Sequence, residues 1–170
     1  MFKLLRFNSR IWFFLGCLGC VFLLAMGAYF HFVQGLDPCP LCISQRIAIL
    51  LTGLVFLMAA LHNPEQSGVT VYAVVGAVTA LCGAAISTRH VWIQHLPADK
   101  VPECGPGLDY VLQNFPLFET VKLMLSGTGD CAKVDWTLFG FSMPAWTLLA
   151  FLMLATLSVL QIWNYKDADR

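Results

Sequence analysis

The segment LDPCPLCISQR, residues 36–46, places a Cys-x-x-Cys pair and an arginine directly before an uncharged run from Ile47 to Leu61. A helix over that run alone is about 22 Å long at about 1.5 Å per residue, whereas the hydrocarbon core of a bilayer is about 30 Å thick. To span a membrane, the helix must therefore begin near Leu41 and include Arg46. This start places Cys42 in the first turn, with Arg46 one turn later on the same helix face.

Hydrophobic segments of spanning length occur at three further places, since about 20 apolar residues suffice for a transmembrane helix. We expect transmembrane helices at about residues 11–32, 69–87 and 144–165, in addition to the helix at residues 41–61. The sequence thus predicts an all-α membrane protein with a four-transmembrane-helix bundle. We expect a single integral membrane domain over residues 1–170, with outer loops at about 33–40 and 88–143.

The composition supports a membrane protein and argues against a nucleic-acid-binding protein. Of the 170 residues, 58% are hydrophobic and 12% are charged, whereas soluble domains average about 45–50% apolar and about 25% charged residues. The formal net charge is +0, so the chain lacks the excess of basic residues that attracts nucleic acids. We therefore expect the lipid bilayer, and no nucleic acid, as a partner.

The N-terminal segment carries cations at Lys3, Arg6 and Arg10 and no acidic residue. This cluster favours a cytoplasmic N-terminus, although Lys and Arg counted over the whole chain are balanced between the two sides. With an even number of spans, both termini are then expected in the cytoplasm. A cleaved signal peptide is the alternative, but the apolar run continues through Phe32 and favours a retained helix.

The outer loop at residues 88–143 holds two cysteines in different settings. Cys104 lies in VPECGPG, whose prolines and glycines oppose a helix and predict an accessible, extended segment. Cys131 follows SGTGD, which is typical of a flexible stretch that allows movement. Between them, PLFETVKLMLSG (residues 116–127) predicts a short amphipathic helix, which lies on the membrane surface or packs against the bundle.

The seven cysteines differ in the setting that the predicted topology gives them. Because both outer loops lie on one side of the membrane, four cysteines share an aqueous edge: Cys39, Cys42, Cys104 and Cys131. The others lie within predicted spans, where an apolar medium suppresses the reactive thiolate, and are expected to be small packing residues: Cys17, Cys20 and Cys82. At Cys39 and Cys42 the helix dipole and Arg46 favour the thiolate, with a static structural disulfide as the alternative.

Arg46 and His90 are the other candidate site residues. An ionisable residue at the membrane edge is costly, so Arg46 indicates a functional site, with snorkelling to lipid headgroups as the alternative. Beside Cys42, Arg46 would stabilise a thiolate and donate charge-assisted hydrogen bonds to an acceptor that gains negative charge. His90 follows the third predicted span at the outer interface, where histidines without any catalytic function are also common.

The order of these motifs resembles the disulfide bond formation protein B (DsbB) family over nearly the whole chain. The resemblance rests on motifs in a fixed order: Cys39-Pro40-Leu41-Cys42 with Gln45-Arg46, Arg89-His90-Val91-Trp92-Ile93-Gln94, Cys104 with Gly129-Asp130-Cys131, and Met143-Pro144-Ala145-Trp146. A Cys-x-x-Cys pair alone is not specific, since Cys17 and Cys20 have the same spacing inside a predicted span. The ordered combination is specific.

This resemblance implies a thiol:quinone oxidoreductase of the bacterial inner membrane. In the family, the second-loop disulfide, here Cys104 with Cys131, oxidises a soluble thioredoxin-like dithiol partner, DsbA, and Cys104 forms the mixed disulfide. Cys131 then attacks Cys39, and Cys42 passes the electron pair to a bound quinone, either ubiquinone or menaquinone. The resemblance further implies a quinone site lined by Cys42, Arg46 and His90.

Two other functions fit part of this pattern. The vitamin K epoxide reductases also link thiol redox chemistry to a quinone in small helical bundles, but their Cys-x-x-Cys lies near the last helix, the reverse of the order here. The four thiolates also suit zinc or copper in a non-enzymatic membrane protein. Cys104 and Cys131 lack a short paired spacing, however, and the sequence supplies no further ligands, so no metal ligand is assigned.

Overall fold

The computed structural model describes residues 9–102 and 114–166, and four long helices dominate it. These are α1 (Ser9–Phe32), α2 (Pro40–His62), α3 (Gln66–Gln94) and α6 (Met143–Lys166). All four are long and apolar enough to cross a membrane. The predicted fold class, an all-α membrane protein with a four-helix bundle, is therefore confirmed, and the chain is a multi-pass membrane protein.

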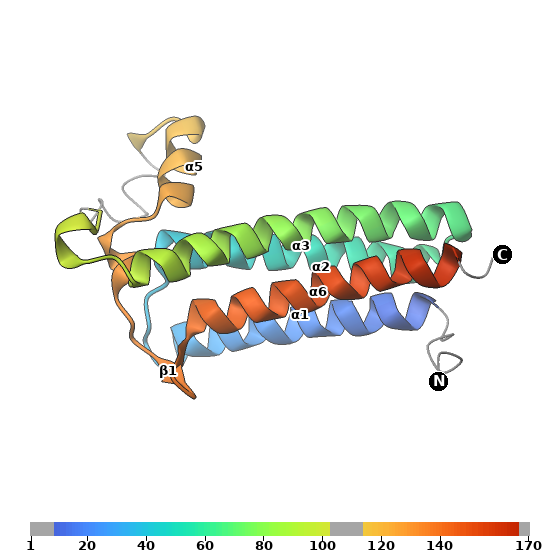
Figure 1. Ribbon diagram of the computed structural model, residues 1–170, viewed down its shortest axis with the longest axis horizontal. Helices are drawn as coiled ribbons and strands as arrows, with labels where there is room; N and C mark the ends of the chain where they lie inside the picture. Colours follow the sequence, from blue (N-terminus) through green and yellow to red (C-terminus); the bar gives the residue numbers. More distant parts are fainter. Residues whose placement is uncertain (1–8, 103–113, 167–170) are drawn as a thin grey trace.

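Figure 1 shows the four long helices side by side along one axis. α2 packs against α1 and α3, and α3 packs against α6, whereas α1 and α6 make few contacts with each other. The first turn of α1 and the last turn of α6 lie at the same end of the bundle (Figure 1). The opposite end, here called the loop end, holds the connection at residues 33–39 and the described parts of the segment at residues 95–142.

Small residues allow the helices to approach closely inside the bundle. Phe56 of α2 is fully buried, and its ring fills the space beside Gly16 of α1 and Gly76 of α3. Alanines line much of the remaining interior: Ala48, Ala59, Ala60, Ala73, Ala80, Ala84 and Ala155. The outward faces carry exposed apolar side chains, among them Leu18, Val21, Leu54, Val78 and Met153. Close packing by small residues and an apolar exterior are expected of a bundle that lipid surrounds.

Helix α3 is longer than the sequence predicts, because it ends at Gln94 and not at Ser87. The polar residues after Ser87 suggest an end there, but neither proline nor glycine interrupts the helix before Gln94. Arg89 stays on the helix and stacks over Trp92, with its guanidinium carbon 4.9 Å from the ring centroid. His90 points inward and is buried. Both Arg89 and His90 therefore belong to the last turns of α3 and not to the outer loop.

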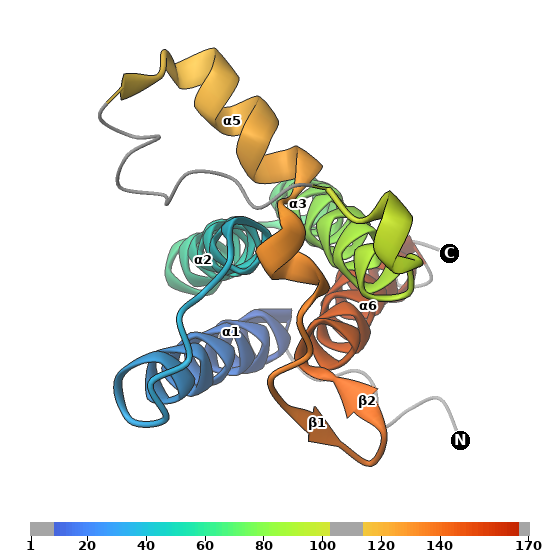
Figure 2. The same cartoon turned by 90° about the vertical axis from the view of Figure 1, so that its left-hand side faces the viewer.

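The described structure is completed by short elements at the loop end. They are η2 (Ala98–Lys100), α5 (Leu117–Ser126), η3 (Gly129–Ala132) and an antiparallel hairpin of β1 (Thr137–Leu138) and β2 (Phe141–Ser142). Figures 1 and 2 show that α5 projects from the bundle beyond α2 and α3, whereas the hairpin projects beyond α1 and α6. The two elements therefore extend away from opposite sides of the loop end.

Helix α5 forms where the sequence predicts a short helix. It contacts α2, and Arg89 holds its C-terminal end, since Nη2 of Arg89 donates a hydrogen bond to the Ser126 carbonyl at 3.2 Å. Leu117 and Phe118 nevertheless remain 83% and 80% exposed. α5 is thus attached to the bundle at one side and presents apolar side chains away from it.

Candidate active site

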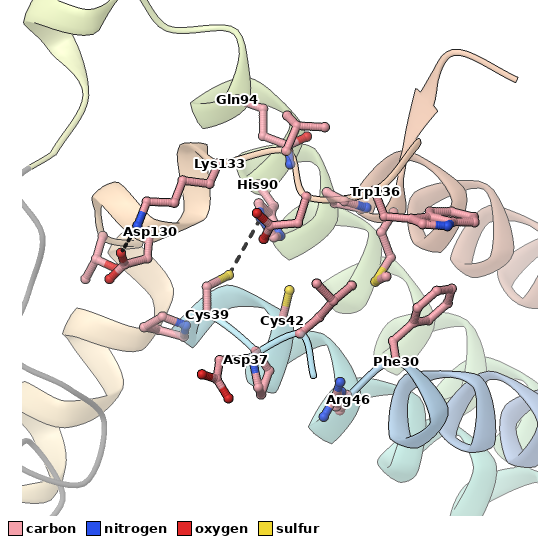
Figure 3. Close-up of a pocket in the computed structure, with 18 of the residues that line it drawn as sticks. Phe30, Asp37, Cys39, Cys42, Arg46, His90, Gln94, Asp130, Lys133 and Trp136 are labelled. Atoms are coloured by element: carbon pink, nitrogen blue, oxygen red, sulfur yellow. Dashed lines mark hydrogen bonds and ion pairs between the residues drawn. The ribbon is translucent and has the colours of Figure 1, made fainter. Parts of the chain in front are cut away.

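Helix α2 begins at the Cys-x-x-Cys pair. Cys39 is the N-cap residue in an extended conformation, with φ −68° and ψ 165°, and Pro40 occupies the start of the helix as the sequence predicts. Cys42 follows in the first turn, and both thiols point into one pocket at the loop end (Figure 3). Both side chains are half-buried free thiols.

His90 connects three segments of the site. Its Nε2 atom lies 3.7 Å from Cys39 Sγ, within hydrogen-bonding distance for sulfur, and its Nδ1 atom lies 3.4 Å from Nε2 of Gln45. The ring also hydrogen-bonds to the backbone of Cys131. When the Gln45 amide donates to Nδ1, the neutral ring carries its proton on Nε2, on the side of the cysteines. His90 and Gln45 are only 2% and 4% exposed, so water cannot replace these contacts.

Cys131 lies against Cys39 because the chain after α5 docks on α2 and α3. Gly127 turns the chain with φ +79°, and a Cβ atom there would lie only 2.7 Å from Ile93 Cδ1 and 2.8 Å from Leu41 Cδ1. Only glycine combines this backbone conformation with so close an approach. The side chains of Cys131 and Cys39 hydrogen-bond to each other as a result of this docking.

The setting of Cys131 corrects the sequence analysis, which predicts an aqueous edge and a flexible tether at this position. Cys131 is fully buried in η3 and packs with Leu41 and Ile93. Its amide donates a hydrogen bond to the Thr128 carbonyl at 2.9 Å. Glycine content alone indicates mobility, but here Gly127 permits the close approach that buries the sulfur.

The pKa values of Cys39 and Cys131 are both raised. The hydrogen bond with Cys131 lowers the pKa of Cys39, but the hydrogen bond with Cys42 and burial outweigh it and raise this pKa to about 12. The hydrogen bond with Cys39, followed by burial, raises the pKa of Cys131. The prediction that the helix N-terminus favours a thiolate at Cys39 is therefore wrong for the reduced site, because neighbouring sulfurs and burial dominate.

Arg46 shares a helix face with Cys42, as their spacing predicts, and both side chains line the pocket. Nη2 of Arg46 donates a hydrogen bond to the Gly27 carbonyl of α1 at 2.8 Å. This bond joins α1 to α2 and fixes the guanidinium group beside the pocket. A guanidinium group has several N–H donors in a planar fork, so one bond to the backbone leaves capacity for a ligand.

The pocket has a volume of about 520 Å³, within the range of about 300–1,000 Å³ that is usual for small-molecule sites. Phe30 of α1 and Trp136 form an aromatic side, with ring centroids 5.0 Å apart. Thr128 also lines the pocket. Around the rings lie further polar and sulfur-bearing side chains, including Asp37, Cys39, Cys42, Arg46, His90, Gln94, Asp130 and Lys133 (Figure 3). The pocket thus combines two aromatic rings, a cation and two thiols.

Thr128 is a site residue that the sequence analysis did not select. It lines the pocket and is only 5% exposed, and its hydroxyl has no hydrogen-bond partner among the residues that the structure describes. A buried hydroxyl without a partner costs about 1–3 kcal/mol, so Thr128 lowers the stability of this part of the site. Gln45 and Trp136 were missed as well. Thr128 and Trp136 carry no local signal, because only the fold brings them to the cysteines, whereas Gln45 follows Cys42 by three positions on the same helix.

The remaining cysteines follow the sequence analysis with one exception. Cys17 and Cys20 are buried inside the bundle, as predicted. Cys82 is exposed on α3 and does not pack in the interior, because its helical position lies between the inward-facing Ala80 and Ala84. Cys104 lies outside the described residues, so its accessibility and its role stay predictions.

Comparisons with known proteins agree on one family. The family model described as "Disulfide bond formation protein DsbB" matches residues 9–161. Disulfide bond formation protein B of Methylococcus capsulatus is 60% identical over 157 residues, which cover 92% of this chain and 96% of that protein. The protein of the same name from Nitrosococcus oceani is 52% identical over 158 residues, covering 93% and 94%. The one from Hahella chejuensis is 55% identical over 145 residues, covering 85% and 88%. With a match along most of its length and relatives of this identity, the chain belongs to the disulfide bond formation protein B (DsbB) family.

Proposed function

We propose that the chain is a disulfide-generating thiol:quinone oxidoreductase of the bacterial inner membrane. The name that its relatives share, disulfide bond formation protein B, supports disulfide chemistry, and the four apolar helices support residence in a membrane. Its reduced substrate is a periplasmic thioredoxin-like thiol oxidase of the DsbA kind. The loop end then faces the periplasm, where disulfides persist, and both termini face the cytoplasm.

The contact between Cys131 and Cys39 is the observation on which this proposal depends. The partner's thiolate attacks Cys104 of a Cys104–Cys131 disulfide, forms a mixed disulfide and releases Cys131 as a thiolate. Since Cys131 lies beside Cys39, its attack on a Cys39–Cys42 disulfide forms the Cys131–Cys39 bond and releases Cys42. No large movement of Cys131 is needed for this second exchange.

Two further exchanges complete the oxidation of the partner. The partner forms its own disulfide and releases Cys104, which attacks Cys131 and breaks the Cys131–Cys39 bond. The Cys104–Cys131 disulfide is thereby restored, and Cys39 and Cys42 are left reduced. The net result is one new disulfide in the partner, with two electrons and two protons now held by Cys39 and Cys42.

The pocket at Cys42 fits a quinone headgroup. Phe30 and Trp136 offer aromatic contacts to its ring, and Arg46 offers donors to its carbonyl oxygens. When bound, a quinone supplies an acceptor for two electrons and two protons and becomes a quinol. The charge of Arg46 stabilises the Cys42 thiolate and the negative charge that grows on a carbonyl oxygen.

His90 completes the proposed quinone site, because it lines the same pocket. Its hydrogen bonds orient the Cys39 sulfur and the backbone of Cys131 relative to each other. His90 is therefore a positioning residue for the exchange between these two sulfurs as well as a side of the pocket.

Quinone absorbance in purified, detergent-solubilised protein tests the proposal. With a reduced thioredoxin-like dithiol present, quinone consumption is expected, and it should vanish in Cys39→Ala, Cys42→Ala, Cys104→Ala and Cys131→Ala. As matched controls, Cys17→Ala, Cys20→Ala and Cys82→Ala should retain nearly full activity. Equal losses in the control variants would overturn this assignment of the cysteines.

A further inference from the structure

Three potential metal ligands meet at the start of α2. Cys39 Sγ, Cys42 Sγ and a ring nitrogen of His90 all lie within 4.8 Å of one another. The distance between Cys39 Sγ and His90 Nε2 is 3.7 Å. In a tetrahedral zinc site, with Zn–S bonds of about 2.3 Å and Zn–N bonds of about 2.0 Å, the ligand atoms lie about 3.5–3.8 Å apart. Small side-chain rotations therefore suffice to bring all three atoms to one ion.

We propose that the reduced chain binds Zn²⁺ through Cys39, Cys42 and His90, and that the bound ion switches the redox relay off. The regulatory consequence rests on the proposed function, whereas metal binding itself does not. The sequence alone indicates no ligand beyond the cysteines, because His90 is far from them along the chain. The structure supplies that ligand by carrying α3 one turn past His90.

The ligand types and their surroundings suit zinc. Thiolate sulfur and imidazole nitrogen are its usual ligands, and two cysteines separated by two residues are a common ligand pair. Gln45 lies 3.4 Å from Nδ1 of His90. With its amide oxygen turned to the ring, Gln45 accepts the Nδ1 proton and leaves the Nε2 lone pair for the ion, as partners of metal-bound histidines do.

Charge and access also favour an ion at this position. Cys39, Cys42 and His90 all line the pocket, so an ion can enter and its fourth coordination position faces the cavity. On binding, both thiols release their protons, and two thiolates neutralise the double charge of the ion. The complex is therefore nearly neutral beside the cation of Arg46, which limits repulsion between them.

Metal binding would be restricted to one redox state. A Cys39–Cys42 disulfide removes both thiolates and leaves His90 as the single ligand of this set. In the reduced state, thiolates held by the ion are withdrawn from disulfide exchange and from electron donation. Zinc would thus hold the chain in its reduced, inactive form until a chelator removes the ion.

Cobalt is a suitable probe, because Co²⁺ in a tetrahedral thiolate site gives visible absorption and thiolate charge-transfer bands. The reduced, metal-free protein is titrated with Co²⁺ under anaerobic conditions, and Zn²⁺ is then added to displace it. We expect one Co²⁺ per chain with a tetrahedral spectrum, lost on addition of Zn²⁺. Protein oxidised at Cys39 and Cys42 should show no such spectrum.

Variants assign the ligands. Cys42→Ser and His90→Gln should each weaken Co²⁺ binding at least tenfold. If one variant fails to fold, the other still tests the site. The double variant Cys17→Ser, Cys20→Ser is the matched control, since it removes a pair of the same spacing without a histidine, and should bind as the parent does. Unchanged affinity in Cys42→Ser and His90→Gln, or equal binding by oxidised protein, would overturn the proposal.

The same preparation separates this inference from the proposed function. Quinone consumption is measured with and without one equivalent of Zn²⁺, and inhibition that a chelator reverses supports the switch. If the protein binds Co²⁺ in a redox-dependent manner but consumes no quinone, the metal site is supported and the proposed function is contradicted. Full quinone consumption by protein that binds no Co²⁺ would remove the metal site alone.

Discussion

Cys39 Sγ lies 3.7 Å from His90 Nε2, although the two residues are 51 positions apart in the sequence. The contact joins the start of α2 to the last turns of α3. Through the same imidazole, α3 also hydrogen-bonds to the backbone of Cys131. One buried side chain thus holds both partners of the proposed sulfur exchange.

Replacing His90 should slow that exchange. For His90→Ala we expect kcat for quinone reduction to fall about tenfold, the effect of losing one hydrogen bond of about 1.4 kcal/mol. His90→Gln keeps a hydrogen-bonding group and should restore part of the rate. Steady-state kinetics with saturating quinone measures the effect. His95→Ala is the control, because His95 is exposed and bonds only locally to the Val91 carbonyl at 2.8 Å; an equal loss there would contradict a specific role for His90.

Gly127→Ala should separate Cys131 from Cys39. An alanine at φ 79° and ψ 155°, a conformation that essentially only glycine adopts, costs about 1–3 kcal/mol in backbone strain, and its Cβ would meet Leu41 and Ile93. We expect slower formation of the Cys39–Cys131 disulfide in a Cys42→Ser, Cys104→Ser background, followed by mass spectrometry. Gly19→Ala is the matched control, since a Cβ there meets nothing within 4 Å. Unchanged disulfide formation in Gly127→Ala would show that docking of η3 does not position Cys131.

Arg46 should govern the affinity for quinone. In Arg46→Ala we expect at least a tenfold larger apparent KM for quinone, because the cation beside Cys42 is lost together with its hydrogen bonds. Arg46→Lys retains the charge but not the planar fork of donors, so an intermediate KM is expected. Arg89→Lys serves as a control, since Arg89 bonds to Ser126 outside the pocket. An unchanged KM in Arg46→Ala would remove Arg46 from the site.

Thr128→Val should raise stability without a change in the affinity for quinone. Valine has nearly the same shape but lacks the unpaired hydroxyl, so the free energy of unfolding should rise by up to about 1 kcal/mol. The KM for quinone should stay as in the parent, because the hydroxyl oxygen is buried and not accessible from the pocket. Thr79→Val offers the contrast, because the Thr79 hydroxyl donates to the Gly76 carbonyl at 3.0 Å; it should lose stability without a change in KM. A larger KM in Thr128→Val would contradict this expectation and show that the hydroxyl reaches the substrate.

The raised pKa of Cys39 predicts a pH dependence of the reduced protein. With the pKa moved from 9.0 to about 12, Cys39 stays protonated near pH 7 and should react slowly with alkylating agents, faster by about tenfold per pH unit. Because the folded state binds this proton more tightly than the unfolded state, its contribution to stability is complete below pH 9 and is lost between pH 9 and 12. Alkylation rates of Cys39 in the reduced parent protein, resolved by mass spectrometry of the Cys39 peptide, and denaturant unfolding against pH measure both effects, because Cys42 and Cys131 must be present for the shift. An alkylation rate that levels off near pH 9 would contradict the shift.

The sequence contained enough to predict the bundle and the start of α2. Uncharged runs of spanning length define the four helices, and the shortness of the run after Arg46 requires Cys42 and Arg46 to enter the helix on one face. Pro40 marks the start because its ring suits the first helical position. These are local properties, and the observed bounds of α1, α2 and α6 follow the predicted ones closely.

The end of α3 and the position of Cys131 could not be predicted in this way. Polar residues after Ser87 suggest a loop, but their side chains find partners while the helix continues. Arg89 stacks over Trp92 and donates a hydrogen bond to the Ser126 carbonyl. His90 lies within hydrogen-bonding distance of Cys39 and Gln45. All but one of these partners lie far away in the sequence. The residues around Ser87 therefore cannot indicate these distant contacts.

By itself, the sequence determined which segments enter the membrane and which cysteines stand beside a cation, because hydrophobic length and helical spacing act over neighbouring residues. Only the tertiary structure decided that Cys131 is buried against Cys39, that His90 reaches the same sulfur, and that Thr128 lines the pocket with an unpaired hydroxyl. The physical reason is that docking of Gly127 on Leu41 and Ile93 depends on steric fit between distant segments. Such a fit exists only once the helices have packed.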